Sequence, residues 1–219
     1  MTTLDRVRGW LGRTSVVRMP PREAYSLWAA RYPPRPHNPL MAAEQAVVAP
    51  LLARLGARCA LDLGTGTGRN LALLVSAGAR LAVGLDLSPA MLAHHEGSTT
   101  RVQADASYLP FRSGVFDVVS SSLMAGDIAD LRGLIGEASR VLAPGGHLVY
   151  SDFHPSWVSR QWRRTFRSDD GREIELPYHP HAMDLHLDAI AAAGLEVRTI
   201  REPRVNEQPV VIVIHATRL

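Results

Sequence analysis

A glycine-rich turn stands between a short apolar stretch and a helical stretch, at residues 61–70 (LDLGTGTGRN). Gly64 and Gly66 have no side chain, so the backbone can approach a ligand where any other residue would collide with it. The helix that starts after the turn adds free backbone N–H groups at the same place. The run therefore predicts a binding site for a small ligand.

The spacing of these glycines separates two classes of cofactor. Dinucleotide-binding turns follow Gly-x-Gly-x-x-Gly, but this turn reads Gly-x-Gly-x-Gly, and Arg69 stands where that pattern needs its third glycine. An acid, Asp62, precedes Gly64 by two residues. A carboxylate there would repel a pyrophosphate and attract the ammonium group of a methionine tail. The charge therefore favours S-adenosylmethionine (SAM) over NAD.

Two further acids follow the next two apolar stretches. Asp86 ends the stretch 81–87, where a carboxylate can accept both hydroxyls of a ribose. Asp105 follows the stretch 102–104, where it can accept from the exocyclic amine of adenine. A single aspartate at a strand end is more often a cap or a turn former. Three acids at successive strand ends, in register with a glycine turn, favour a nucleoside site.

Strand-like and helical segments alternate along most of the chain, which predicts an α/β fold with parallel βαβ units. The polar segment 153–180, rich in Arg, Trp and His, carries no strong strand pattern, and we expect a lid or insertion there. We assign residues 1–56 to an N-terminal arm and helical cap, and residues 57–219 to a SAM-binding domain. The expected strands are 59–63, 81–87, 102–104, 115–121, 147–152, 195–201 and 209–217, and the expected helices are 22–30, 39–55, 70–77, 89–94, 131–142 and 181–193.

Two more motifs complete a family pattern. Phe116-Asp117-Val118-Val119 and the Pro-Gly-Gly turn within Val141–Leu148 follow the glycine turn and the acids in order. Together these motifs resemble the class I SAM-dependent methyltransferases, in the small-molecule branch with a Rossmann-like core. The resemblance is strong over residues 59–152. It implies a seven-stranded sheet of order 3-2-1-4-5-7-6 with strand 7 antiparallel, helices on both faces, and methyl transfer that leaves S-adenosylhomocysteine (SAH).

The same resemblance implies roles for individual residues. Separate residues would contact the methionine, the ribose and the adenine of the cofactor. A tyrosine of the N-terminal helix would cover the cofactor's outer face. A backbone contact after the fourth strand would lie near the methionine amine. The residues implied are Asp62, Gly64, Thr65 and Gly66 for methionine, Asp86, Leu87 and Met91 for ribose and its surroundings, Asp105 and Ala106 for adenine, Ser121 for the backbone contact, and Tyr25 for the outer face.

The catalytic residues are less clear. Many relatives carry a histidine or tyrosine a few residues after the fourth strand, but this chain has Gly126 near that position, so a general base cannot be transferred from them. Asp152 and His154 follow the fifth strand directly, and strand ends face the ligand crevice in α/β sheets. We therefore interpret His154 as a candidate general base and Asp152 as its orienting partner or a substrate ligand, with turn capping by both residues as the alternative.

Several basic residues are candidates for binding the acceptor. Arg160, Arg163, Arg164 and Arg167 would form one stripe on a helix, which is either a solvated face or a site for an anionic substrate. We select Arg163 and Arg164, together with His181 at the start of the last helix, as substrate contacts. No metal site is expected, because His179, His181 and His186 lack the spacing and the additional ligands of a tetrahedral site.

Composition limits the remaining possibilities. The 219 residues include 46% hydrophobic and 21% charged residues, with a net charge of +3, which is typical of an ordinary globular domain. There is no lysine, which excludes Schiff-base and P-loop chemistry. The single cysteine, Cys59, and the lack of a signal peptide or long apolar run favour a cytoplasmic protein without membrane partners. We expect a monomer or homodimer.

Three functions are compatible with this sequence. The first is transfer of a methyl group to a small molecule, with an oxygen nucleophile favoured. The second is methylation of RNA or protein, although residues 120–123 read SSSL rather than the D/N-P-P-Y/F turn of enzymes that methylate base amines. Nucleic acid is accordingly not an expected partner. The third is SAM or SAH binding without methylation.

Overall fold

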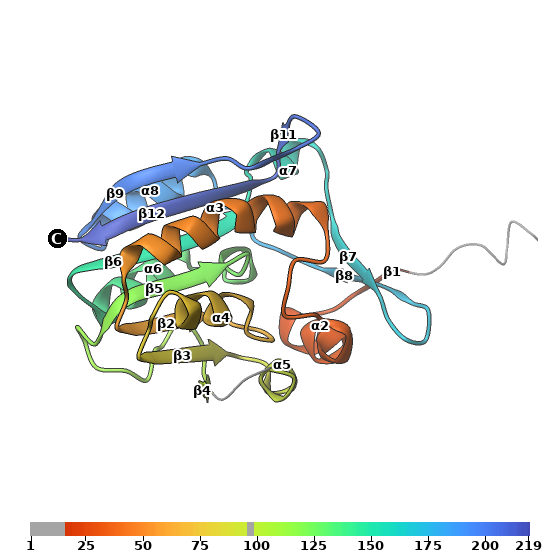
Figure 1. The fold of residues 1–219 in the computed structure, drawn as a ribbon. Helices are drawn as coiled ribbons and strands as arrows, with labels where there is room; N and C mark the ends of the chain where they lie inside the picture. Colours follow the sequence, from red (N-terminus) through yellow and green to blue (C-terminus); the bar gives the residue numbers. More distant parts are fainter. Residues whose placement is uncertain (1–15, 96–98) are drawn as a thin grey trace, which may run out of the picture.

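The structure, a computed structural model, describes residues 16–95 and 99–219 (Figure 1). Its main feature is a seven-stranded sheet in the order β4-β3-β2-β5-β6-β12-β9. Counted along the chain this order is 3-2-1-4-5-7-6, and β12 is antiparallel to both neighbours, so the predicted Rossmann-like fold is confirmed. The strands are β2 (Cys59–Leu63), β3 (Leu81–Asp86), β4 (Thr100–Gln103), β5 (Phe116–Ser122), β6 (Leu142–Phe153), β9 (Leu195–Arg201) and β12 (Val211–Arg218).

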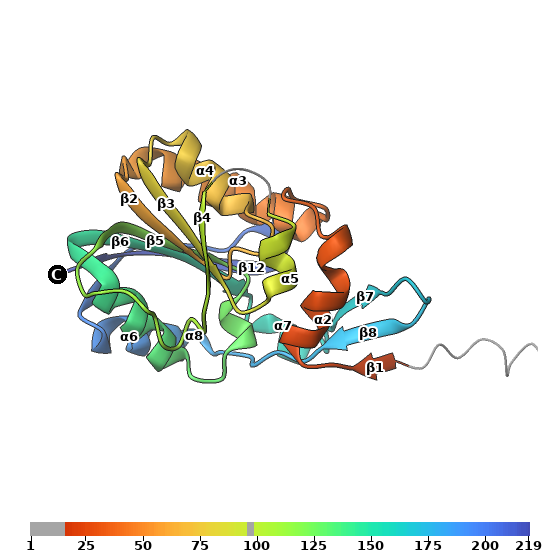
Figure 2. The same cartoon turned by 90° about the horizontal axis from the view of Figure 1, so that it is seen from below.

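Helices cover both faces of the sheet, as Figure 2 shows with α3 and α4 on one side and α6 and α8 on the other. One apolar core lies under α3 and α4, and a second lies under α6 and α8. None of the helices in the described part of the chain is both long and apolar enough to cross a membrane. The helices of the two layers are α3 (Pro39–Leu55), α4 (Arg69–Ser76), α6 (Leu131–Val141) and α8 (Met183–Ala192), and α5 (Pro89–Ala93) follows β3.

Local sequence signals explain the helices nearest the glycine turn. Asn38 caps α3 by accepting from the backbone N–H of Met41, and Gly56 ends the helix in the left-handed region. Ser88 caps α5 in the same way, and Pro89 is its first residue. Because both helices begin at the carboxyl edge of the sheet, their first turns face the same side as the glycine turn.

A small second sheet lies beside this edge, of order β1-β8-β7. With α2 it encloses its own apolar cluster, in which Ala24, Phe166, Ile174 and Leu176 are buried. We call β1, α2, η1, β7 and β8 the cap. The bounds are β1 (Val16–Arg18), α2 (Pro21–Trp28), η1 (Ala29–Arg31), β7 (Arg164–Arg167) and β8 (Glu173–Leu176), while η2 (Ala125–Asp127), α7 (Ser156–Ser159), β10 (Arg204–Val205) and β11 (Gln208–Pro209) connect the other elements.

The cap corrects two expectations. Segment 153–180 contains a β-hairpin where no strand pattern was recognised, and the arginines 160–167 do not form a helical stripe because Arg164–Arg167 is a strand. Phe166 faces the cap cluster while its neighbours Thr165 and Arg167 are exposed, which is the alternation of a strand. The expected arm over residues 1–15 lies outside the described residues, and the division at residues 56 and 57 stays a prediction.

Candidate functional site

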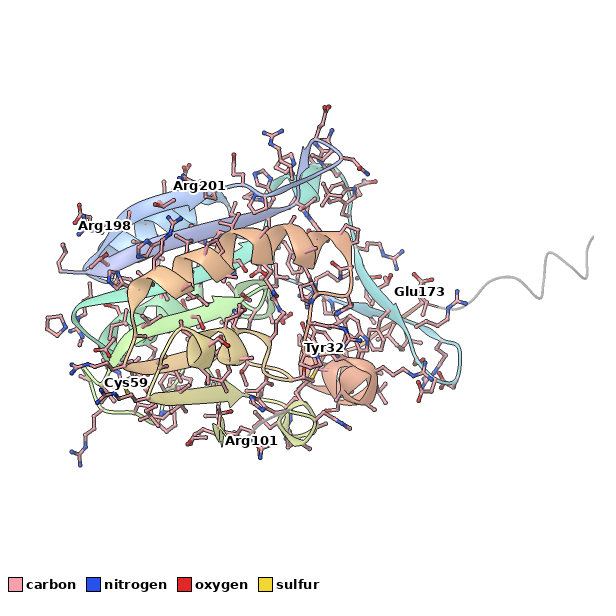
Figure 3. All side chains as sticks on the ribbon, in the orientation of Figure 1. Tyr32, Cys59, Arg101, Glu173, Arg198 and Arg201 are labelled. Atoms are coloured by element: carbon pink, nitrogen blue, oxygen red, sulfur yellow. The ribbon has the colours of Figure 1, made fainter. Side chains whose placement is uncertain are left out.

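A cavity of about 710 Å³ lies between the cap and the carboxyl ends of β2, β3 and β5. This volume is within the range of small-molecule sites, and the position is the usual ligand crevice of a parallel sheet. Tyr32 lines the cavity, and Figure 3 shows it beside α2. The same figure shows Cys59 at the first residue of β2, away from the carboxyl end of that strand. Cys59 is therefore remote from the cavity.

The glycine turn forms one wall of the cavity. Gly64, Gly66 and Gly68 all have positive φ, which favours glycine. A Cβ on Gly66 would meet no atom within 4 Å, so the backbone there is open to a ligand. A Cβ on Gly64 would instead lie 2.5 Å from Cγ of Met124. Gly64 thus admits a neighbouring side chain, while Gly66 presents backbone to the cavity.

Asp62 lies beneath the turn and is 2% exposed. Its Oδ1 accepts a 2.5 Å hydrogen bond from the hydroxyl of Ser120. Burial raises the pKa of Asp62 to about 6, and the Ser120 hydrogen bond opposes that rise. The carboxylate is therefore charged at neutral pH. In the described part of the chain the salt bridges at this cavity join Arg69 to Glu44, Arg163 to Glu175 and Arg164 to Asp127, so Asp62 forms no salt bridge. The charge of Arg69 lowers the pKa of Asp62 only from a distance and does not outweigh burial.

Asp86 connects the end of β3 to the glycine turn. Its Oδ2 accepts from the N–H of Gly66 and its Oδ1 from the N–H of Ser88, both at 2.8 Å. Burial raises the pKa of Asp86, and these two N–H groups partly offset the rise. The carboxylate is thus fixed in orientation, and both oxygens keep lone pairs for further donors.

The remaining predicted nucleoside contacts line the same cavity. Asp105 is exposed at its edge, where Oδ1 accepts from the N–H of Ser107 and Oδ2 stays available. Leu87, Met91 and Ala106 also contribute to the lining. Carboxylates therefore stand at the ends of β2, β3 and β4, with apolar groups between the last two.

These residues fit a SAM molecule. The buried carboxylate of Asp62 suits the cationic ammonium of a methionine, and the open backbone at Gly66 suits the chain next to it. The free lone pairs of Asp86 suit ribose hydroxyls. Asp105 and the backbone of Ala106 suit the edge of adenine. Charge, hydrogen-bonding capacity and order along the sheet all agree with this cofactor.

Glu44 and Arg69 form a buried ion pair on the glycine-turn side, where Arg69 also lines the cavity. Oε2 of Glu44 accepts from Arg69 at 2.7 Å, while Oε1 accepts from the hydroxyls of Ser122 and Ser151 at 2.5 and 2.9 Å. The network joins α3, α4, β5 and β6. Sequence analysis missed it, although a glutamate within the apolar pattern of α3 was an available signal.

A second buried network closes the cavity on the cap side. Arg164 donates to Oδ1 of Asp127 at 2.6 Å and to the hydroxyl of Tyr25 at 2.6 Å, and that hydroxyl donates to Oδ2 of Asp127 at 3.1 Å. The side chains of Arg164 and Asp127 are 8% and 10% exposed. Burial raises the pKa of Tyr25 well above its usual value, so the phenol stays neutral. The network connects α2, η2 and β7, and Asp127 was not predicted.

Four predicted site residues do not line the cavity, namely Ser121, Asp152, His154 and His181. His154 bonds to Ser156 and Glu202 through its two ring nitrogens. Asp152 is buried, accepts from the N–H groups of Gly126 and Phe153, and has a pKa raised by burial to about 7. His181 bonds through Nε2 to the carbonyl of Ile128.

The length of β6 explains the placement of the two catalytic candidates. The strand continues through Phe153, so Asp152 still lies within β6, where successive side chains point to opposite faces of the sheet. Its side chain points towards His186 of α8 rather than towards the carboxyl edge of the sheet. His154 comes after the strand, where its backbone N–H bonds to Val210 of the neighbouring segment. The expected catalytic pair is therefore not brought to the cavity.

Of the three predicted acceptor contacts, the two arginines line the cavity and His181 does not. Arg163 and Arg164 both line the cavity, and each is paired with a carboxylate. Among the described residues, no group of three or more His, Cys, Asp or Glu could hold a metal ion. The cavity also has an aromatic lining on the cap side that sequence analysis only partly recognised, formed by Tyr25, Trp28, Tyr32, Phe153 and Trp157.

The chain is similar in sequence to known methyltransferases. Residues 61–150 match the family model described as a methyltransferase domain. The chain is 44% identical over 104 residues to a demethylmenaquinone methyltransferase of Thermus thermophilus, covering 43% of this chain and 47% of that protein. It is 36% identical over 151 residues to a malonyl-[acyl-carrier protein] O-methyltransferase of Herminiimonas arsenicoxydans, covering 68% of this chain and 56% of that protein.

The chain thus spans about half the length of the curated relatives it matches. Among solved structures, a putative S-adenosylmethionine dependent methyltransferase from Listeria monocytogenes has a TM-score of 0.70 at 21% identity. The match covers 81% of this chain and 99% of that one. At this identity the likeness concerns the fold.

Proposed function

We propose that this chain, whose fold and matched domain are those of the class I SAM-dependent methyltransferases, binds SAM in the cavity and transfers its methyl group to a small molecule. The observation that carries the proposal is the row of carboxylates at successive strand ends. Asp62, Asp86 and Asp105 line one cavity beside the glycine turn. Their order matches the ammonium, ribose and adenine of a single ligand.

The chain's residues would divide the binding of SAM between them. Asp62 would pair with the ammonium group, and Asp86 would accept the ribose hydroxyls. Thr65 and Gly66 would offer backbone to the methionine, with the backbone of Ser121 nearby. Asp105 and Ala106 would hold adenine between Leu87 and Met91, and Tyr25 would cover the outer side. When bound, SAM supplies a methyl group on a positively charged sulfur.

On the acceptor side, the chain would mainly position the substrate and exclude water. The cap closes the cavity opposite the glycine turn, so the nucleophile would be held in line with the methyl group in a dry site. We favour an oxygen nucleophile. Of the two curated relatives described above, the one that covers more of this chain is named an O-methyltransferase. We assign no proton transfer to Asp152 or His154, since neither lines the cavity.

Calorimetric titration with SAH tests the cofactor site. We expect Asp86→Asn to weaken SAH binding by about 100-fold, because two hydrogen bonds to a charged acceptor lose much of their strength. Asp170→Asn is the matched control, since Asp170 is an exposed carboxylate in the cap hairpin. Unchanged SAH affinity in the Asp86 variant, with native thermal stability, would disprove the site assignment.

Transfer needs a separate experiment. The protein is incubated with methyl-labelled SAM and fractions of small metabolites, and label in a low-molecular-weight product supports the proposal. Label in RNA or protein would support the second function considered for this sequence. Tight SAH binding without transfer to any fraction would favour a non-methylating role.

A further inference from the structure

The cap side of the cavity balances its charges internally. Arg164 is paired with Asp127 and Arg163 with Glu175, both at 2.6 Å. On the opposite side, beside the glycine turn, Arg69 is paired with Glu44 at 2.7 Å. The remaining arginine of the lining, Arg22, is exposed on α2. Within the described residues, no buried arginine of the cavity is therefore left with an uncompensated charge.

Both terminal nitrogens of the Arg164 guanidinium group already have acceptors. Besides its bonds to Asp127 and Tyr25, it lies over the ring of Phe153, 4.9 Å from the centroid. An anionic ligand would have to break this buried ion pair and leave Asp127 without its cation. Such a rearrangement is strongly unfavourable. The arginine expected to recognise an anion is thus not available for one.

Aromatic rings also line the cavity on this side. Tyr25 and Trp28 stack with their planes 5° apart, and the rings of Trp28 and Tyr32 meet edge to face at 4.9 Å. Burial raises the pKa of both Tyr25 and Tyr32, so these phenols are neutral. Rings of this kind favour flat partners through stacking and edge contacts. We call this part of the cavity the acceptor chamber.

We infer that the acceptor is an uncharged molecule with a flat ring system, and that the Arg164–Asp127 pair sets this selectivity by cancelling the chamber's charge. The inference rests on the proposed function, because it describes the second substrate of the same cavity. It replaces the anionic acceptor that the arginine stripe suggested. A neutral ring loses little hydration free energy on entering the chamber, whereas a carboxylate loses much and meets no buried arginine without an acidic partner among the described residues.

Two matched probes test this selectivity in the SAH-saturated protein. The first, 1-naphthol, is neutral at pH 7, and the second, 1-naphthoate, has the same rings and a negative charge. We expect 1-naphthol to bind at least about tenfold more tightly, measured by calorimetry or by quenching of tryptophan fluorescence. Equal or tighter binding of 1-naphthoate would overturn the inference.

A charge-removal series tests the role of the ion pair. Asp127→Asn keeps the shape and one acceptor oxygen but leaves the charge of Arg164 uncompensated, so the preference should shift towards 1-naphthoate by about tenfold. The double variant Asp127→Asn/Arg164→Gln should return the preference to neutral probes. Asp188→Asn is the control, because it removes the partner of Arg132 in an exposed ion pair. A folded Asp127→Asn protein with unchanged preference would contradict the inference.

A milder variant covers the case in which Asp127→Asn does not fold. Glu175→Gln releases Arg163, whose side chain is 48% exposed, and should move the preference in the same direction by a smaller factor. No shift in that variant would also contradict the inference. SAH binding is titrated separately for each protein. Loss of SAH binding would count against the proposed function. Normal SAH binding with the wrong probe preference would count against the acceptor class alone.

Discussion

The two sides of the cavity hold their carboxylates in different ways. On the glycine-turn side, Asp62 is 2% exposed and forms no salt bridge among the described residues, and burial raises its pKa to about 6. On the cap side, the side chain of Asp127 is 10% exposed and is held by Arg164 and Tyr25. A buried charge without a partner destabilises the folded chain unless a ligand supplies one. Asp62, which has no salt bridge, therefore points to a cationic ligand group, while the paired carboxylates Asp127 and Glu44 point to structure and selectivity.

The largest effect that would sharpen this comparison concerns the fully buried Glu44. Glu44→Ala leaves Arg69 buried without its anion and removes the acceptor of two serine hydroxyls, so it should lower the free energy of unfolding by about 3–5 kcal/mol. Denaturant titration measures the loss. Gln45→Ala is the control, because Gln45 accepts only a longer bond from the same arginine. A loss below about 1 kcal/mol for Glu44→Ala would show that paired carboxylates are not structural here.

The next effect concerns Asp62, where stability and binding should respond to pH in opposite directions. The folded-state pKa is raised, so this group favours folding most when protonated, and its contribution is lost as pH rises from about 4 through about 6. SAH affinity should instead increase over that interval, because the ionised carboxylate pairs with the ammonium group.

Asp62→Asn separates these two trends from those of other titrating groups. The variant should abolish the Asp62 part of both pH dependences, make the ligand-free protein more stable at pH 8, and bind SAH about 100-fold more weakly. Thermal unfolding and calorimetry between about pH 4 and pH 8 measure both quantities, and this range spans the ordinary and the raised pKa of Asp62. A variant with wild-type SAH affinity, or with lower stability at pH 8, would contradict the comparison.

A smaller effect is expected at the cap. Tyr25→Phe removes one hydroxyl that donates to Asp127 and accepts from Arg164, which should cost about 2 kcal/mol of stability. The ion pair itself remains, so the preference for a neutral probe should persist. Tyr108→Phe serves as the control, since Tyr108 is 81% exposed. A reversed probe preference in Tyr25→Phe would assign the selectivity to the hydroxyl instead of the ion pair.

The two sides also differ in how far the sequence could predict them. Asp62, Asp86 and Asp105 each follow a short apolar strand, and parallel strands bring their carboxyl ends to one edge of a sheet. Local pattern and a general rule were enough to place them in one cavity. The strand order of the sheet was predicted from the family resemblance and not from local patterns.

The cap side depends on contacts between distant segments. Tyr25 and Arg164 are 139 residues apart, and β7 is stabilised through β8 by β1 near the start of the chain. Period-two burial in Arg164–Arg167 is short and is obscured by arginines that also fit a helix. The hairpin and the pairing of Arg164 with Asp127 were therefore beyond what local patterns could give.

His154 gives the smallest expected effect and a direct test of where catalysis is located. Its ring nitrogens bond to Ser156 and to Glu202, whose side chain is 45% exposed, and it does not line the cavity. His154→Ala should therefore change stability by less than about 1 kcal/mol, since such partly exposed contacts contribute little. Once an acceptor is known, the transfer rate should stay within about twofold of wild type, because proton transfer requires a group within hydrogen-bonding reach of the reacting atom. A rate reduced by 100-fold or so, with SAH affinity intact, would mean that the acceptor reaches past the cap to the end of β6. The acceptor chamber would then hold only part of the substrate, and its neutral character would describe that part alone.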